Sequence, residues 1–205
     1  MLFNKIQAKC IDLAQNFDAI PTERKVLLNK ISNYIQQKKD GNLPIQLMYV
    51  CTHNSRRSHF GQIWASVAAE FYSVPNVATF SGGTEATAFN VNAINALKGL
   101  GFEIEAKDES SNPVFEVKFS ETAKPSICFS KVYNDQSNPT SNFASIMTCG
   151  DAEENCPFIP GVELRIGTTY DDPKEFDGTD LQDSKYKERA LQIALETLYV
   201  FSLIK

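Results

Sequence analysis

The chain has 205 residues, a hydrophobic share of 42% and a formal net charge of −5 at pH 7. This length fits one domain, or one domain with an appendage, and the apolar share excludes general disorder. The acidic balance argues against nucleic-acid binding, and the lack of any long apolar run argues against a membrane-spanning helix. The opening residues, MLFNKIQAKCIDLAQ, lack the apolar core of a signal peptide, so we expect a cytoplasmic protein.

The first part of the chain, residues 1–43, is expected to be a helical extension packed on a main domain at 44–205. Apolar residues recur at helical spacing on both sides of Pro21, which predicts a pair of helices. Cys10 falls on the packed stripe of the first helix. Gly41 is expected to end the second helix in a left-handed conformation.

From residue 45 onward, apolar strands alternate with amphipathic helices. The expected elements are a strand at 45–51, a helix at 58–73, a strand at 77–83, a helix from 91 that runs through glycines into a strand near 104, a β-hairpin within 114–133, strands at 144–149 and 162–170, and a helix at 184–204. This order predicts an α/β domain with a mostly parallel sheet.

One stretch of this acidic chain contains no acidic residue at all. It lies between Asp40 and Glu70 and holds the adjacent Arg56 and Arg57 together with both histidines. An acid-free stretch with two arginines is compatible with a local anion-binding site. The alternative is that acidic residues are absent by chance from a mostly apolar strand and helix. The two histidines are expected to be loop and helix-surface residues rather than catalysts.

The segment CTHNSRRS starts at Cys51, where an apolar strand passes into a helix. A loop in this position directs its backbone N–H groups and the positive end of the helix at one point, which suits a tetrahedral oxyanion above a reactive thiolate. Arg57 can hold two oxygens of the anion, and Ser58 can donate a hydrogen bond to the thiolate. The candidate oxyanion-binding residues are Thr52, His53, Asn54, Ser55, Arg56, Arg57 and Ser58.

The remaining cysteines do not suggest a disulfide framework, because the total of five is odd and no secretion signal is present. The spacing of Cys149 and Cys156 is too wide for an ordinary zinc knuckle and no CxxC occurs, so we expect no metal. Cys10 and Cys128 are expected to be core thiols.

The CTHNSRRS loop resembles the phosphate-binding loop of the low-molecular-weight protein tyrosine phosphatases and of the thioredoxin-coupled arsenate reductases. The resemblance covers most of residues 45–205 and includes FSGGTEA (80–86) and the Asp-Pro loop YDDPKEFDGT (170–179). It implies a three-layer α/β fold with a central, mostly parallel four-stranded sheet. The N-terminal helical pair and the hairpin at 114–133 are then additions to that fold.

The Asp-Pro loop implies a general acid. In the resembled family this role belongs to the aspartate directly before the proline, which is Asp172 and not Asp171. A carboxyl group on a separate loop can close over the anion and protonate the leaving oxygen. The alternative is that Asp172 only caps a turn before Pro173.

The segment MTCGDAEENCPFIPG (147–161) resembles the redox segment of the arsenate reductases. The resemblance implies a relay in which Cys51 attacks arsenate, Cys149 attacks Cys51, and Cys156 attacks Cys149. Thioredoxin, an external reductant, then reduces the last disulfide, and no bound cofactor is implied. The alternative is that Cys149 is a buried strand cysteine and Cys156 a surface one.

Two other functions stay open at this point. One is a phosphatase that hydrolyses phosphotyrosine or a small phosphomonoester through a phosphocysteine at Cys51, and the other is an oxyanion-binding or redox-sensing module without turnover. The chain also departs from the family pattern. His53 stands where glycine is usual, Arg56 where a cysteine or small residue is common, and Gln62 replaces an acidic residue of a structural potassium site, so we expect no such site.

Overall fold

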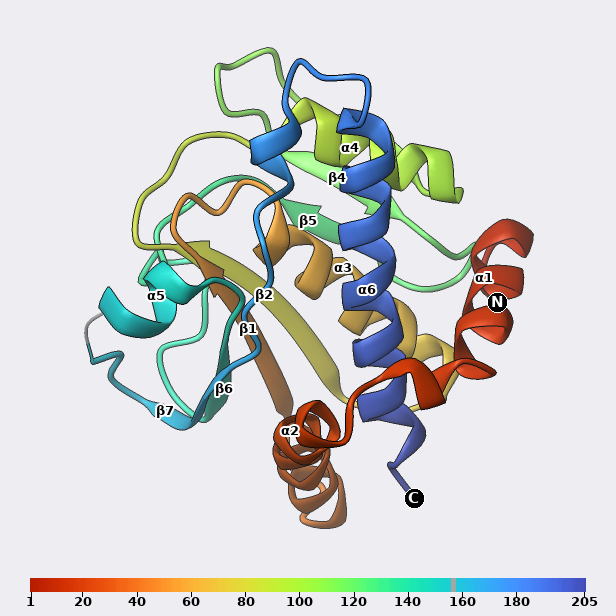
Figure 1. Cartoon of the computed structure of the whole chain (residues 1–205). Helices are drawn as coiled ribbons and strands as arrows, with labels where there is room; N and C mark the ends of the chain where they lie inside the picture. The colour runs from red at the N-terminus through yellow and green to blue at the C-terminus, as the bar shows by residue number, and fades with distance from the viewer. Residues whose placement is uncertain (156–157) are drawn as a thin grey trace.

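The computed structural model describes residues 1–155 and 158–205. At its centre lies a sheet with the strand order β2-β1-β6-β7, in which every neighbouring pair is parallel (Figure 1). Its strands are β1 (Ile45–Cys51), β2 (Val77–Gly83), β6 (Phe143–Met147) and β7 (Val162–Gly167). The expected α/β fold with a parallel four-stranded sheet is confirmed. β1 is apolar along nearly its whole length, as a parallel strand covered on both faces requires.

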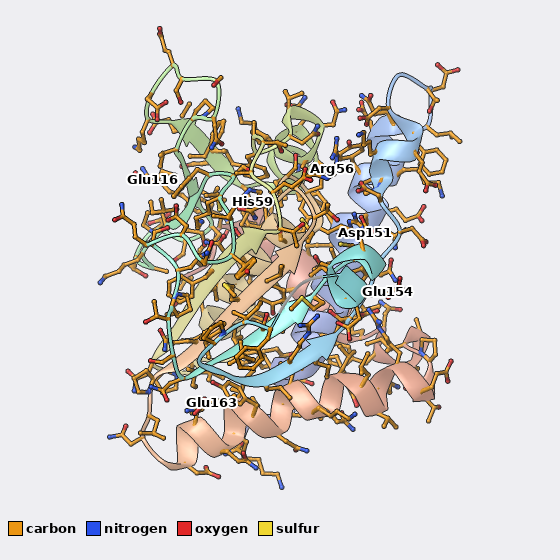
Figure 2. All side chains as sticks on the ribbon, turned by 90° about the vertical axis from the view of Figure 1, so that its left-hand side faces the viewer. Arg56, His59, Glu116, Asp151, Glu154 and Glu163 are labelled. Carbon is orange, nitrogen blue, oxygen red and sulfur yellow. The ribbon has the colours of Figure 1, made fainter. Side chains whose placement is uncertain are left out.

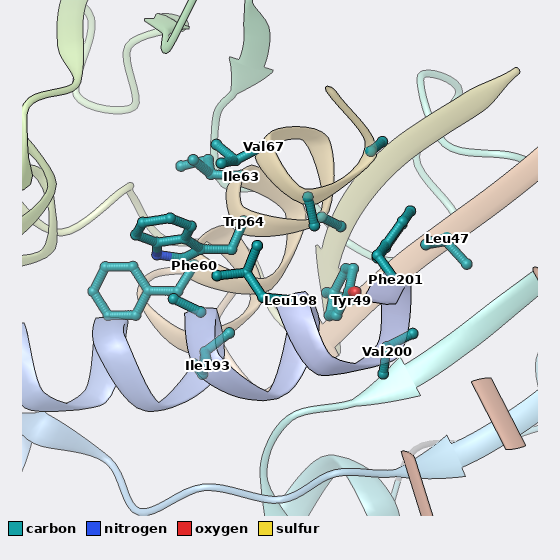
Figure 3. Close-up of a cluster of buried hydrophobic side chains, with 14 of the residues drawn as sticks. Leu47, Tyr49, Phe60, Ile63, Trp64, Val67, Ile193, Leu198, Val200 and Phe201 are labelled. Carbon is teal, nitrogen blue, oxygen red and sulfur yellow. The ribbon is translucent and has the colours of Figure 1, made fainter. Parts of the chain in front are cut away.

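Helices flank the sheet on both faces. The helices are α1 (Asn4–Ala14), α2 (Thr22–Asp40), α3 (Arg57–Phe71), α4 (Val91–Leu100), α5 (Gly150–Asn155) and α6 (Gln182–Ser202), with short 3-10 turns η1 (Phe17–Ala19) and η2 (Pro173–Phe176). Figure 1 shows α6 running alongside α3 in front of the strands. The core between them includes Phe60 and Trp64 of α3 and Leu198 and Phe201 of α6, all fully buried (Figure 3).

The alternation of side chains along β1 divides the interior into two cores. Leu47 and Tyr49 pack into the main core with α3 and α6 (Figure 3). Met48 and Val50 point to the other face, where they join a smaller cluster that includes the first turn of α5. The residue that follows, Cys51, also belongs to this smaller cluster, and its sulfur lies 3.1 Å from Ser58 Oγ in the first turn of α3.

The N-terminal helices share the main core. Cys10 of α1 is fully buried there, and α2 begins directly after Pro21, as predicted. Ser32 of α2 donates a 3.0 Å hydrogen bond to a carbonyl oxygen of α6. The division of the chain at residue 43 stays a prediction. The expectation for Gly41 is wrong: its φ is −78°, and Asn42 takes the left-handed conformation with a φ of 51°.

A second sheet, with the order β3-β4-β5, is antiparallel. Its strands are β3 (Glu103–Ala106), β4 (Phe115–Lys118) and β5 (Ser126–Cys128). The predicted hairpin is therefore present as β4 and β5. The strand after α4 pairs with this hairpin instead of joining the central sheet. The N-terminal extension also meets this part of the chain, because Leu2 forms a β-bridge with Ser120 and Phe3 N–H donates to the Phe119 carbonyl at 2.9 Å.

The segment after β5 runs back to the central sheet. Gly83 N–H donates to the Lys131 carbonyl at 2.9 Å, and Tyr133 N–H donates to the Gly83 carbonyl at 2.8 Å. These bonds place residues 130–133 beside the carboxyl end of β2, next to the loop that follows β1. No helix within residues 1–155 and 158–205 is long and apolar enough to cross a membrane.

Candidate active site

Cys51 ends β1 at the carboxyl edge of the central sheet, between β2 and β6. Ligands of open parallel sheets bind at this edge. The Cys51 side chain is buried, and its sulfur lies 3.1 Å from the hydroxyl oxygen of Ser58. A thiol at the end of a buried strand has a fixed position relative to the loop that follows it.

Asn54 shapes that loop. It is fully buried and left-handed, with a φ of 44°, a conformation that asparagine adopts more readily than most residues. Its amide nitrogen donates to Ser58 Oγ at 2.8 Å, and its amide oxygen accepts from Lys131 N–H at 2.9 Å. Because Ser58 Oγ accepts from Asn54, the hydroxyl hydrogen of Ser58 is available to the Cys51 sulfur. Ser58 can thus stabilise negative charge on that sulfur.

The loop opens directly into α3, which begins at Arg57. The first N–H groups of a helix have no partner within it, and they form its positive end. The Cys51 sulfur contacts this end of the helix through Ser58, in the first turn of α3. Together, loop and helix have the parts needed to bind a tetrahedral oxyanion.

Arg57 connects the loop to the Asp-Pro segment. Its Nη1 donates to the Tyr170 carbonyl at 2.8 Å, and its Nη2 donates to Asp172 Oδ2 at 2.6 Å. Its Nε is buried and has no hydrogen-bond partner among residues 1–155 and 158–205. One donor of Arg57 therefore has no protein partner within these residues.

Asp172 lies beside the loop, whereas the adjacent Asp171 does not. Asp172 also caps η2, because its Oδ1 accepts from Lys174 N–H at 3.1 Å, so the turn-capping alternative describes a real contact as well. Asp171 is 90% exposed at its side chain and pairs with Arg189 at 3.2 Å. Of the two aspartates, only Asp172 is in a position to meet a ligand bound by Arg57.

The guanidinium of Arg56 is directed away from the centre of the loop. Its Nε donates to the hydroxyl of Tyr186 at 2.7 Å, and its Nη2 lies 3.5 Å from Asp177 Oδ2. Its Nε is also 4.0 Å from Asp172 Oδ1. In Figure 2, Arg56 lies above α5, which carries Asp151 and Glu154. The assignment of Arg56 to the oxyanion-binding residues stays a prediction.

Cys149 lies close to the same loop. It follows β6, it is buried, and it belongs to the same small apolar cluster as Cys51. Its sulfur is 3.4 Å from Thr52 Oγ1 and accepts from Ala152 N–H in the first turn of α5, also at 3.4 Å. The predicted partner, Cys156, lies outside the described residues.

Comparison with known proteins finds arsenate reductases among the relatives, although no family model matches the chain. The arsenate reductase of Halalkalibacterium halodurans is 28% identical over 134 residues, which are 65% of this chain and 78% of that protein. The arsenate reductase of Bacillus subtilis is 27% identical over 144 residues, 70% of this chain and 84% of that protein. A solved arsenate reductase in the phosphate-binding state shares the fold, with a TM-score of 0.52 and 18% identity over 78% of this chain and 99% of that one.

The chain is an enzyme similar to the arsenate reductases, and it shares the fold of the solved reductase. The predicted resemblance of the chain to these enzymes is thereby confirmed, while the CTHNSRRS loop as an oxyanion loop and the roles of individual residues in this enzyme stay predictions.

The sequence did not indicate which residues in and near the hairpin (114–133) support the CTHNSRRS loop. Ser130 is buried, and its hydroxyl donates to the His53 carbonyl at 2.9 Å and accepts from Thr87 N–H at 2.7 Å. Asn112 holds the main chain of Ser130 from both sides, at 2.7 and 3.1 Å. No local sequence pattern predicts these contacts, because they join residues that are 18 to 77 positions apart.

The two histidines of the enzyme differ. His53 is in the loop with a part-exposed side chain, 3.7 Å from Glu85, in agreement with the prediction. The expectation of a surface position for His59 is wrong, because it is fully buried and stacks on Phe89 with ring centroids 4.1 Å apart. Burial, aided by the nearby Lys131 ammonium, lowers the pKa of His59 well below its usual value. Helical spacing alone missed this, because residues from other segments cover His59: Phe89 stacks on its ring, and Ser81 Oγ lies 3.2 Å from its Nδ1.

The other candidate residues have structural positions. The Gln62 amide nitrogen donates to the carbonyl oxygens of Thr79 and Ile127 at 3.3 and 3.1 Å, and so joins the two sheets. Cys10 and Cys128 are fully buried, and burial raises the pKa of each thiol to about 12. Within the part of the chain that the structure describes, no group of three or more His, Cys, Asp or Glu could hold a metal ion.

Proposed function

We propose that this enzyme is an arsenate reductase that uses Cys51 as nucleophile and Cys149 and Cys156 for thioredoxin-linked turnover. Cys51, Arg57 and Asp172 are the proposed catalytic residues of the first step. The residues from Thr52 to Ser58 would bind the oxyanion. The proposal places the protein in the cytoplasm, where free thiols persist, and Cys51 and Cys149 are free thiols in the structure.

In the first step, the Cys51 thiolate attacks the arsenic atom of arsenate and a sulfur–arsenic bond forms. One oxygen leaves as water after it is protonated, and Asp172 is the proposed proton donor. Arg57 and the backbone N–H groups of the loop balance the charge on the remaining oxygens.

In the second step, the Cys149 thiolate attacks the sulfur of Cys51. The sulfur–arsenic bond breaks and its electron pair goes to arsenic, which leaves as arsenite, while Cys51 and Cys149 form a disulfide. Cys156 then attacks Cys149 as a thiolate and releases the Cys51 thiolate. The two electrons that arsenate received are restored when the dithiol of thioredoxin reduces the disulfide of Cys149 and Cys156.

One observation supports the reductase proposal above the others, namely the position of Cys149. Its sulfur contacts Thr52, the residue next to the nucleophile, and both cysteines share one apolar cluster. The Ala152 N–H that points at the Cys149 sulfur would stabilise a thiolate there. Hydrolysis of a phosphate ester does not need a second cysteine at this position.

The test is consumption of NADPH on addition of arsenate, with thioredoxin and thioredoxin reductase supplied. We expect arsenate-dependent turnover in the wild type and none beyond one equivalent in Cys149→Ser. Cys128→Ser is the matched control, since that thiol is buried away from the loop, and it should keep multiple turnover. Equal turnover in wild type and Cys149→Ser would overturn the relay.

A second candidate is hydrolysis of phosphotyrosine or a small phosphomonoester. The contact of Asp172 with Arg57 favours it, because a thiolate, an arginine and an acid are sufficient for that reaction. Hydrolysis of p-nitrophenyl phosphate without arsenate-dependent NADPH consumption would favour the phosphatase. Cys149→Ser should then hydrolyse the ester at the wild-type rate.

A further inference from the structure

The Arg57 guanidinium has two adjacent N–H donors on the edge that could bind an anion, and one of the two is already occupied. Its Nε and Nη2 lie on the same edge of the guanidinium, and Nε has no partner among the residues described. Nη2 is already bound to Asp172 Oδ2 at 2.6 Å. Arginine holds a tetrahedral anion best through two adjacent donors. An oxyanion that takes this edge therefore meets the carboxylate of Asp172 at the second nitrogen and is repelled by it.

A second guanidinium stands at the other oxygen of the same carboxylate. Arg56 Nε lies 4.0 Å from Asp172 Oδ1. Hydrogen bonds to the Tyr186 hydroxyl and to Asp177 hold this guanidinium in place, and the Tyr186 hydroxyl itself donates to Asp177 at 2.7 Å. The Arg56 side chain is only 10% exposed. Arg56 is thus a fixed and buried cation close to this carboxylate.

We infer that Arg56 is a positioning residue that retains Asp172 when an oxyanion occupies Arg57. In the structure Asp172 binds Arg57, and on binding of an oxyanion its carboxylate moves to Arg56. This exchange lowers the repulsion between Asp172 and the anion and keeps the carboxyl group beside the reacting atoms. The inference rests on the oxyanion site of the proposed function, but it concerns binding alone and does not depend on the redox steps.

A double-mutant cycle of phosphate binding tests the inference. Inorganic phosphate is titrated by calorimetry into the wild type, Arg56→Gln, Asp172→Asn and the double variant. We expect Asp172→Asn to bind phosphate more tightly than the wild type, because the competing charge is gone. Arg56→Gln should weaken binding by about 5- to 10-fold with Asp172 present and by less than about twofold in the Asp172→Asn background.

The outcomes separate the possible explanations. If Arg56→Gln weakened binding equally in both backgrounds, Arg56 would act by its charge or through folding, and the inference would be overturned. Phosphate binding with such additive effects would leave the oxyanion site of the proposed function intact. A wild type that does not bind phosphate would overturn both.

Tyr186→Phe provides a second variant that keeps every charge. It removes only the hydroxyl that anchors Arg56 at 2.7 Å. We expect Tyr186→Phe to weaken phosphate binding when Asp172 is present and to leave the affinity unchanged in the Asp172→Asn background. This variant tests the inference even if Arg56→Gln does not fold. An unchanged affinity of Tyr186→Phe in both backgrounds would contradict the inference.

Discussion

The hydroxyl of Ser130 donates a 2.9 Å hydrogen bond to the main-chain carbonyl of His53, across 77 residues of sequence. The same oxygen accepts from Thr87 N–H at 2.7 Å. One buried side chain therefore fixes the oxyanion loop to the segment after β2. The hairpin region, which is an addition to the resembled fold, is in this way part of the support of the candidate active site.

Ser130→Ala should lower kcat/KM by about 10-fold while the protein remains folded. The substitution leaves the His53 carbonyl and the Thr87 N–H without their partner, so the loop loses its fixed position. Steady-state kinetics with arsenate or an aryl phosphate would show this, with thermal unfolding as the check on folding. Ser130→Thr should restore most of the activity, and Ser137→Ala, which changes an exposed serine of the same region, should have no effect.

Gly83→Ala should displace the loop and weaken phosphate binding by about 10-fold or more. A Cβ at Gly83 would lie 2.6 Å from the Thr52 carbonyl oxygen and 2.7 Å from the Asn54 nitrogen, both of which are backbone atoms of the loop. Calorimetric titration of phosphate measures the loss. Gly99→Ala is the control: its Cβ would meet nothing within 4 Å, and in helix α4 it should raise the stability by about 0.5–1 kcal/mol.

Asp172→Asn should slow aryl phosphate hydrolysis by about 10²–10⁴-fold if this carboxyl group protonates the leaving oxygen. The loss should be greatest for leaving groups of high pKa, since these depend most on a proton donor. Asp171→Asn is the matched control, because Asp171 pairs with Arg189 at the surface. Equal losses in the two variants would show that the loop as a whole, and not the acid, had been disturbed.

His59 should make the stability of the protein depend on pH. Its pKa is lowered in the folded state, because it is fully buried and near the Lys131 ammonium, while the unfolded chain has the ordinary value of 6.5. Below pH 6.5 the unfolded state binds the additional proton, so the free energy of unfolding falls as the pH falls. The loss attributable to this one group grows as the pH falls further below 6.5.

Urea unfolding between pH 5 and pH 8 would measure this dependence. His59→Asn should flatten the profile below pH 6.5, although it lowers the stability at every pH through lost packing. His53→Asn changes the only other histidine, which is part-exposed, and should leave the wild-type slope. If the free energy of unfolding of His59→Asn fell with pH as steeply as that of the wild type, the acid sensitivity would come from carboxylates instead of His59.

The sequence predicted the parts of the site that are adjacent along the chain. Cys51, the loop after it and Arg57 lie at one strand-to-helix junction, so their spacing determines their arrangement. Asp172 was found because an aspartate before proline is a local pattern too. The contact between Asp172 and Arg57 joins residues 115 positions apart, and only the resemblance to a family pointed to it.

The features that the sequence did not predict depend on tertiary contacts. His59 was expected at the surface, because helical periodicity cannot reveal that a distant segment covers that face of α3. The strand after α4 was predicted near residue 104, but the sequence did not indicate its partner, which is β4. The positive φ at the end of α2 belongs to Asn42 and not to Gly41, since both residue types tolerate it and packing chooses between them.

The bridge of Leu2 to Ser120 and the bond of Phe3 to Phe119 have a consequence for the history of this protein. A hairpin gained without the N-terminal extension would have exposed unpaired backbone groups and the apolar side chains that now lie beneath residues 2 and 3. An extension gained without the hairpin would have had no strand to pair with. We therefore expect both additions to occur together among descendants of the same ancestor, so that a homologue that has lost one has also lost the other.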